Sequence, residues 1–151
     1  MKELFKFIEG AVQTTLENDV ANHAKDVLKD KIQTVVYDQY DPTEYERKYS
    51  NGGLLDDENI EIKKGKGSIS IRSTRTNDDD TDGRDGYARG TKDVASILET
   101  GTGYTWTRSA IYQMQPYPRP FHYETFLEMQ KTLSHVDALK RGLKRLGISV
   151  L

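Results

Sequence analysis

The chain has 151 residues, a length that suits one domain. Hydrophobic residues make up 35% and charged residues 30%, so the core is small or neighbouring subunits complete it. The net charge of −2 gives no overall attraction to nucleic acid. The sequence has no cysteine, which excludes disulfides, thiol catalysis and cysteine-based metal sites. It shows neither a signal-peptide pattern nor the ~18 apolar residues of a membrane span, so we expect no membrane partner.

The first predicted element is a long helix over residues 2–38. A continuous helix of that length would reach about 55 Å, more than the ~30 Å expected across a compact body of this size. Either part of the helix projects or packs on another subunit, or the helix breaks near Gly10, and the pattern leaves both open. Asp41-Pro42 ends the element. The apolar residues that recur at steps of three and four, on one predicted face, are Leu4, Ile8, Val12, Leu16, Val20, Ala24, Val27, Leu28, Ile32 and Val35.

Two strands are predicted next, over residues 54–63 and 68–74. In the second strand Ile69 and Ile71 alternate with polar residues, and the glycine-rich stretch between the strands fits a hairpin loop. A two-stranded hairpin is not stable alone, so its apolar face should pack on the long helix. Residues 76–92 are rich in acids and glycine and predict a long flexible loop.

The second half of the chain predicts a short helix or strand, a strand, and a late helix, over residues 94–99, 104–112 and 121–133. A proline-rich stretch, 116–120, gives an extended path into the late helix. Helix continues or restarts over 136–146 and stops at Gly147. The whole chain, 1–151, is therefore predicted to be a single α+β domain. A long N-terminal helix and a C-terminal helix pack on a small, mainly antiparallel sheet with a long acidic loop.

No pattern typical of a catalytic or cofactor site occurs in the sequence. The three histidines, His23, His122 and His135, lack the spacing of a zinc site, and ordinary structural or surface roles are expected for them. Gly101-Thr102-Gly103 lacks the third glycine and the strand–helix context of a dinucleotide-binding loop. We therefore expect no catalytic residue and no cofactor.

The acidic loop contains a partial cation-binding pattern. Asp78, Asp80 and Asp82, followed by Gly83, match the first half of a calcium loop. Its twelfth position is Arg89, where a bidentate glutamate is required, so a solvated loop is preferred over a metal site. The acids could instead meet a basic surface on a partner. A metal-dependent nuclease that uses them is a further alternative.

The late helix carries a basic row beside an apolar one. A solvated face, a phosphate contact and pairing with an acidic surface all fit that row. Identical subunits in a ring meet head to tail, so the acidic loop of one copy could meet the basic helix of the next. The candidate residues for contact with a partner or a second copy are Asp78, Asp79, Asp80, Asp82, Trp106, Tyr117, Arg119, Lys140, Arg141, Lys144 and Arg145.

Three segments, in this order, are similar to motifs of one known family. Residues 36–49, with Tyr45-Glu46-Arg47, resemble a tyrosine-x-arginine turn by which a long first helix enters a sheet. Residues 97–103 resemble an "I-x-E-x-G" element, and Tyr117-Pro118-Arg119-Pro120-Phe121 resembles an "x-R-P-F" lead-in to a last helix. These motifs resemble the HK97 gp10-like family of bacteriophage tail-component or neck proteins.

The resemblance implies a structural, non-enzymatic virion protein, made in the host cytoplasm, that joins or completes the tail at the head–tail interface. Such a protein would form a six-fold ring with itself around the DNA channel. Its partners would be head-closure, tail-terminator or tail-tube proteins, and DNA would pass through without sequence reading. The alternative is a small nucleic-acid-binding or regulatory protein that uses the basic C-terminal helix, which predicts salt-sensitive DNA binding.

Overall fold

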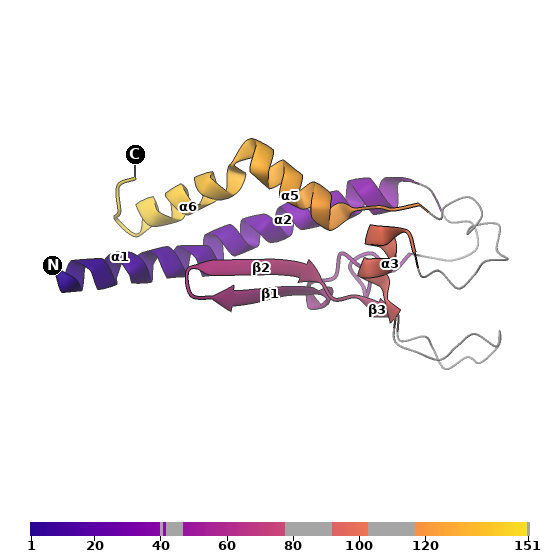
Figure 1. The fold of residues 1–151 in the computed structure, drawn as a ribbon, viewed down its shortest axis with the longest axis horizontal. Helices are drawn as coiled ribbons and strands as arrows, with labels where there is room; N and C mark the ends of the chain where they lie inside the picture. The colour runs from indigo at the N-terminus through magenta and orange to yellow at the C-terminus, as the bar shows by residue number, and fades with distance from the viewer. Residues whose placement is uncertain (40, 42–46, 78–91, 103–116, 151) are drawn as a thin grey trace.

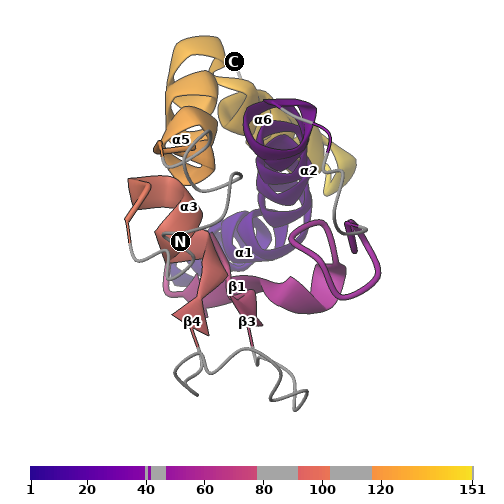
Figure 2. The ribbon, with the colours of Figure 1, turned by 90° about the vertical axis from the view of Figure 1, so that its right-hand side faces the viewer.

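The computed structural model describes residues 1–39, 41, 47–77, 92–102 and 117–150. A long helix runs along the length of the molecule, with a β-hairpin on one side and two C-terminal helices on the other (Figure 1). The view along the long axis shows the same three layers, with the long helix in the middle (Figure 2). The predicted α+β class is confirmed.

The long helix is continuous, although its hydrogen-bond pattern changes along it. It comprises α1 (Lys2–Thr15), the π-helical turn η1 (Leu16–Val20), α2 (Ala21–Lys31), the π-helical turn η2 (Ile32–Val36) and the 3₁₀ turn η3 (Tyr37–Gln39). The junction residues Leu16 and Ile32 keep right-handed helical dihedrals, so no junction breaks the axis. The helix also passes through Gly10, and the predicted alternative of a break there is wrong.

The π-helical turn η1 shifts the buried face of this helix. Buried residues step by four from Ala11 to Thr15, then by five from Thr15 to Val20. A turn of i→i+5 hydrogen bonds inserts one extra residue, which returns the next side chain to the same face. The fully buried Thr15 donates its hydroxyl to Ala11 O at 2.8 Å and so leaves no unpaired polar group. Every residue from 1 to 10 is exposed, so this end of the helix projects.

The hairpin pairs β1 (Ile60–Gly65) with β2 (Ser68–Ser73) in an antiparallel register that places Ile62 opposite Ile71. The first strand begins later than predicted, because the 3₁₀ turn η4 (Asp57–Asn59) precedes it and Asp56 caps that turn. The second strand shows the predicted alternation of exposed and half-buried residues.

The hairpin turn is fastened to α1, as a hairpin unstable by itself requires. The side-chain amide of Gln13 donates to Gly65 O at 2.9 Å, and Gly67 N donates to Gln13 Oε1 at 2.8 Å.

A second small ladder joins β3 (Thr76–Asn77) to β4 (Lys92–Asp93), and α3 (Val94–Thr100) follows. Asp93 caps α3 by accepting from Ser96 N at 3.0 Å, so the segment predicted as short helix or strand is a helix. The two ends of the loop predicted over residues 76–92 pair in this ladder. Residues 78–91, between them, lie outside the described part of the chain. The predicted strand over 104–112 lies wholly outside that part too.

The late helical region is two helices, α5 (Phe121–Thr132) and α6 (Ser134–Arg145). Leu133 separates them with a left-handed φ of +53°, so the helix restarts after it. Gly147 follows with a φ of +81° and ends the region, as predicted. In the packing of the layers, α5 lies on α2 and α6 lies on α1 and η1.

The core lies where the long helix, the hairpin, α3 and α5 meet. Phe121, Leu28 and Ile32 are completely buried there. The full cluster consists of Leu28, Ile32, Val36, Tyr37, Leu54, Ile60, Ala95 and Phe121. In the part of the chain that the structure describes, no helix is both long and apolar enough to cross a membrane.

Candidate functional site

The described parts of the three motif segments singled out in the sequence lie at one end of the molecule, the right-hand end in Figure 1. Tyr45 and Glu46 of the first segment lie outside the described residues. In the first segment, the Arg47 guanidinium lies 5.3 Å from the centre of the Tyr37 ring and donates to Tyr37 O. The Tyr37 hydroxyl accepts a hydrogen bond from Leu54 N at 3.1 Å. Burial raises the pKa of Tyr37, because the interior disfavours the phenolate. The segment therefore closes the end of the long helix against the start of the sheet.

The second and third segments pack directly on each other. Arg119 N donates to Leu98 O at 2.7 Å. Gly101 ends α3 with a φ of +68°, and a Cβ placed there would lie 2.5 Å from Pro118 N. Only glycine fits that backbone contact, because any side chain would collide with the proline-rich lead-in.

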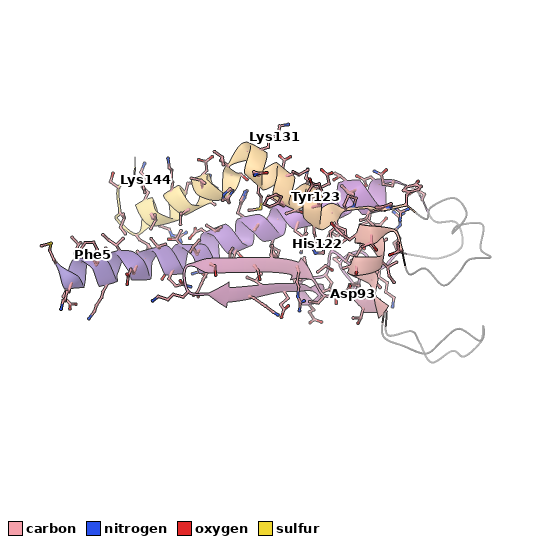
Figure 3. The ribbon with its side chains drawn as sticks, viewed as in Figure 1. Phe5, Asp93, His122, Tyr123, Lys131 and Lys144 are labelled. Atoms are coloured by element: carbon pink, nitrogen blue, oxygen red, sulfur yellow. The ribbon has the colours of Figure 1, made fainter. Side chains whose placement is uncertain are left out.

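Glu99 joins α3 to the beginning of α5. Its Oε2 accepts from His122 N at 3.0 Å, and its Oε1 accepts from Tyr123 N at 3.1 Å. The N-cap position of α5 is Pro120, which makes no side-chain cap hydrogen bond. A carboxylate from another element thus satisfies the free amides at the positive end of the helix dipole. The labelled His122 and Tyr123 mark this helix start in Figure 3.

His122 ties the same helix start to the sheet. Its Nδ1 lies 3.2 Å from Glu99 Oε2, and its Nε2 accepts a hydrogen bond from Ser73 N at 3.0 Å. An accepting Nε2 carries no proton, so this arrangement assigns the proton to Nδ1, facing the carboxylate. One imidazole thereby connects β2, α3 and α5. The structural role expected of His122 agrees with these contacts.

We name these contacts among Leu98, Glu99, Gly101, Arg119 and His122 the motif junction. The hydrogen bonds to Leu98 O, Glu99 and His122 join β2, α3 and the start of α5 and hold these three elements in a fixed arrangement. No group of three histidine, aspartate or glutamate side chains suited to a metal ion occurs among the described residues. The aspartates predicted as a weak cation site, Asp78, Asp80 and Asp82, lie outside those residues.

Sequence reasoning did not foresee the capping of α5 by Glu99 or the bond from Ser73 to His122. The sequence held a signal for the capping by Glu99, because Pro120 before a helix has no side-chain oxygen to cap it. The bond from Ser73 to His122 had no signal, since 49 residues separate its partners and only the fold brings them together.

The predicted basic row lies on the exposed side of α6. Arg145 donates to Asp19 Oδ2 at 2.8 Å and so fastens α6 to η1. Lys140, Arg141 and Lys144 are exposed and form no ion pair with other described residues. Lys144 is labelled on the outer side of α6 in Figure 3. Three cations thus remain available to an external anion.

The other predicted contact residues divide into surface and interior. Tyr117 is 46% exposed, whereas Arg119 is only 4% exposed and its guanidinium lies 5.3 Å from the centre of the Tyr117 ring. A side chain buried to that degree offers little surface to a second subunit, so Arg119 belongs to the motif junction. Asp78, Asp79, Asp80, Asp82 and Trp106 lie outside the described residues.

Large apolar side chains are also left uncovered at two places. On α1, Leu4, Phe5 and Phe7 are 57–61% exposed. On α5, Tyr123 and Phe126 are each 57% exposed. Neighbouring exposed apolar side chains of this size mark surfaces that contact other molecules more often than isolated ones do.

Fold and surfaces together define a small helix-rich α+β protein with a polar junction at one end and uncovered apolar and basic faces. The family model YomN matches residues 1–145, and the chain belongs to the YomN family. One relative is the SPbeta prophage-derived protein YomN of Bacillus subtilis (strain 168). It is 30% identical over an alignment of 151 residues, and the alignment covers 98% of this chain and 95% of the relative. No solved structure matches the chain.

These comparisons support one part of the sequence prediction, the bacteriophage origin, and correct another, the family. A relative from a prophage, matched over nearly its whole length, supports the bacteriophage origin that the motif resemblance implied. The family that matches is YomN and not the HK97 gp10-like family. The tail or neck role therefore rests on other arguments.

Proposed function

We propose that the chain is a structural protein of a tailed bacteriophage virion that joins or completes the tail at the head–tail interface. The observation that carries the proposal is the uncovered apolar and basic surface of a protein with a prophage-derived relative. A subunit that fits between other subunits leaves such faces for its neighbours to cover. The motif junction supports this role, because it fixes the start of α5, the helix that presents the exposed Tyr123 and Phe126, against α3 and β2.

In this proposal the protein is made in the host cytoplasm and assembles as a six-fold ring around the DNA channel. Its partners are further copies and the head-closure, tail-terminator or tail-tube proteins, and it performs no catalysis. A ring requires a heterologous contact, in which two different surfaces of one chain meet on adjacent copies. Lys140, Arg141 and Lys144 supply one such surface for an acidic face of the next copy, or for the DNA phosphates that pass through.

The location is tested on purified virions of the phage that encodes the chain. An antibody against the chain should label the neck or tail in negative-stain images, and particles lacking the gene should remain unlabelled. Its absence from intact particles would overturn the proposal.

The ring contact is tested by charge reversal. The double variant Lys140→Glu with Arg141→Glu should reduce the assembled fraction, and added salt should reduce it in the unaltered chain, because screening weakens exposed charge pairs. The variant Lys48→Glu with Lys66→Glu makes the same change in charge at exposed positions away from α6 and serves as control. Assembly that responds to neither salt nor the α6 variant would rule out a role for this row.

Nucleic-acid binding or regulation is the second candidate, favoured by the same three cations on α6, which form no ion pair with other described residues. It predicts that the isolated protein binds duplex DNA, with log affinity falling by about 0.9 per log unit of salt for each phosphate contacted. Lys144→Glu should reduce the steepness of that salt dependence by about 0.9, the value for one phosphate contact. DNA binding by the free protein together with absence from virions would favour this candidate over the structural one.

A further inference from the structure

The free end of α1 carries an apolar face that the rest of the described chain leaves open. From Ala11 onward the helix is packed under α6, where Gly142 lies against Thr15. Before that point Leu4, Phe5 and Phe7 are 57–61% exposed and Ile8 is 37% exposed. At about 100° per residue these four side chains occupy a continuous arc of about 160°. We call this arc the α1 face.

The charges beside the α1 face are complementary to the same charges on a second, antiparallel copy. Lys2 and Glu9 are seven residues apart, so they lie on the same edge of the face, two turns from each other. Neither forms an ion pair with other described residues, whereas Glu3, beyond the other edge of the face, pairs at 3.6 Å with Lys6 on the far side of the helix. An antiparallel second copy brings the same edges together and sets Lys2 of each chain opposite Glu9 of the other. A parallel copy would instead set this edge opposite the other edge of the face, where Glu3 already pairs with Lys6.

A lipid surface suits the α1 face less well. Helices that lie on membranes carry an excess of lysine and arginine on their polar side, because anionic headgroups attract them. Residues 1–10 contain two lysines and two glutamates, which balance. The balanced charges therefore favour a protein surface of mixed charge over a lipid surface as the partner of the α1 face. A second copy of the α1 face is such a surface.

We propose that two copies of this chain associate through the α1 face, antiparallel about a two-fold axis near Phe5 and Lys6, with reciprocal Lys2–Glu9 pairs. An isologous contact of this kind closes at two copies. It is therefore distinct from the heterologous ring contact proposed above, and either contact can fail without the other. The face is smaller than the ~800 Å² per partner of a standard stable interface, so the dimer is reversible and depends on concentration.

The first experiment is sedimentation equilibrium of the full chain over a range of concentrations. The unaltered protein should dimerise, and Phe5→Ser should abolish the dimer without loss of helix by circular dichroism, because residue 5 is exposed. A chain that stays monomeric up to ~1 mM, or a dimer that survives Phe5→Ser, would overturn the proposal. Binding to lipid vesicles that Phe5→Ser removes, with no dimer in solution, would assign the face to a membrane instead.

The second experiment tests orientation and register by charge exchange. Lys2→Glu and Glu9→Lys should each weaken the dimer about tenfold, since each places like charges opposite each other at two symmetric positions. An equimolar mixture of the two single variants should recover the dimer, because every contact then joins opposite charges. The double variant should recover it alone.

Lys131→Glu is the matched control, since it changes charge equally at an exposed position in the last turn of α5 (Figure 3). Its dimer should match that of the unaltered chain. A mixture of the two single variants that fails to recover would refute the antiparallel register.

Discussion

At the scale of single residues, the motif junction depends on small geometric requirements that few residue types meet. Gly101 is the clearest case, because it combines a left-handed φ with a backbone contact. Glu99 is another, since its two carboxylate oxygens each accept from a different free amide of α5. These requirements explain why the sequence segments stand out without forming a catalytic pattern.

Replacing Gly101 with alanine should destabilise the fold by about 2–5 kcal/mol. A left-handed φ costs a residue with a Cβ about 1–2 kcal/mol, and overpacking against backbone adds about 1–3 kcal/mol. Gly67→Ala provides the control, because Gly67 has a φ of +69° but a Cβ at that position would meet nothing within 4 Å. Urea unfolding of both variants measures the difference, and equal losses would show that the contact with Pro118 is unimportant.

At the scale of elements, the long helix shows which features the spacing of apolar residues predicts and which it misses. Steps of three and four correctly predict a helix along its whole length, and the stripe includes the buried Val20, Ala24, Leu28 and Ile32. In the first turns the stripe is misplaced, since Ala11 and Thr15 are buried instead of Val12 and Leu16. The π-helical turn η1 shifts the face by one residue, and a fixed period of 3.6 cannot represent such a shift.

Gly10→Ala should stabilise the protein by about 0.5–1 kcal/mol. The glycine lies within α1, and a Cβ there would meet nothing within 4 Å, so alanine gains helix propensity without a clash. Thermal unfolding should show a rise in Tm of about 2 °C.

Gly142→Ala is the contrasting variant, made in α6. Its Cβ would lie 2.3 Å from Thr15 Cγ2, so the same chemical change should lower Tm. A fall in Tm for Gly10→Ala would contradict a continuous α1.

At the scale of the whole molecule, Asp57 joins the turn before the hairpin to the long helix, and its neighbour Asp56 stabilises that turn. Asp57 accepts from Lys29 and lies 3.1 Å from Lys25, and these lysines lower its pKa. Hydrogen bonds from Gly52 N and Glu58 N lower the pKa of Asp56. Each carboxylate therefore binds protons less readily in the folded chain than in the unfolded chain.

Stability should fall in acid for that reason. The contribution of Asp56 and Asp57 is complete above the ordinary aspartate pKa of about 3.9 and is lost as pH falls through their lowered folded values. Asp57→Asn should reduce this acid dependence, and Asp38→Asn, whose carboxyl makes a local bond to Gln33, serves as control. Urea midpoints measured from neutral to acid pH give the comparison. An unchanged acid slope in Asp57→Asn would refute the linkage.

The candidate site was only partly accessible to sequence reasoning. The motif segments were identified, as was the exposed basic row on α6, because local composition and spacing reveal both. The interior position of Arg119 was not foreseen, since an arginine beside three prolines gives no sign of being 4% exposed. The bonds within the motif junction join residues 21 to 49 positions apart, which no local pattern encodes.

The sequence by itself determined the long N-terminal helix, the hairpin and the late helices, the alternation in β2, the helix stop at Gly147 and the lack of cysteine chemistry. These depend on local preference and periodicity, which short stretches of chain carry in full. Only the tertiary structure decided that α1 projects beyond α6 and that the described parts of the three motif segments lie at one end. Coverage depends on which distant element reaches a surface, so the uncovered α1 face appears only when the whole chain is folded.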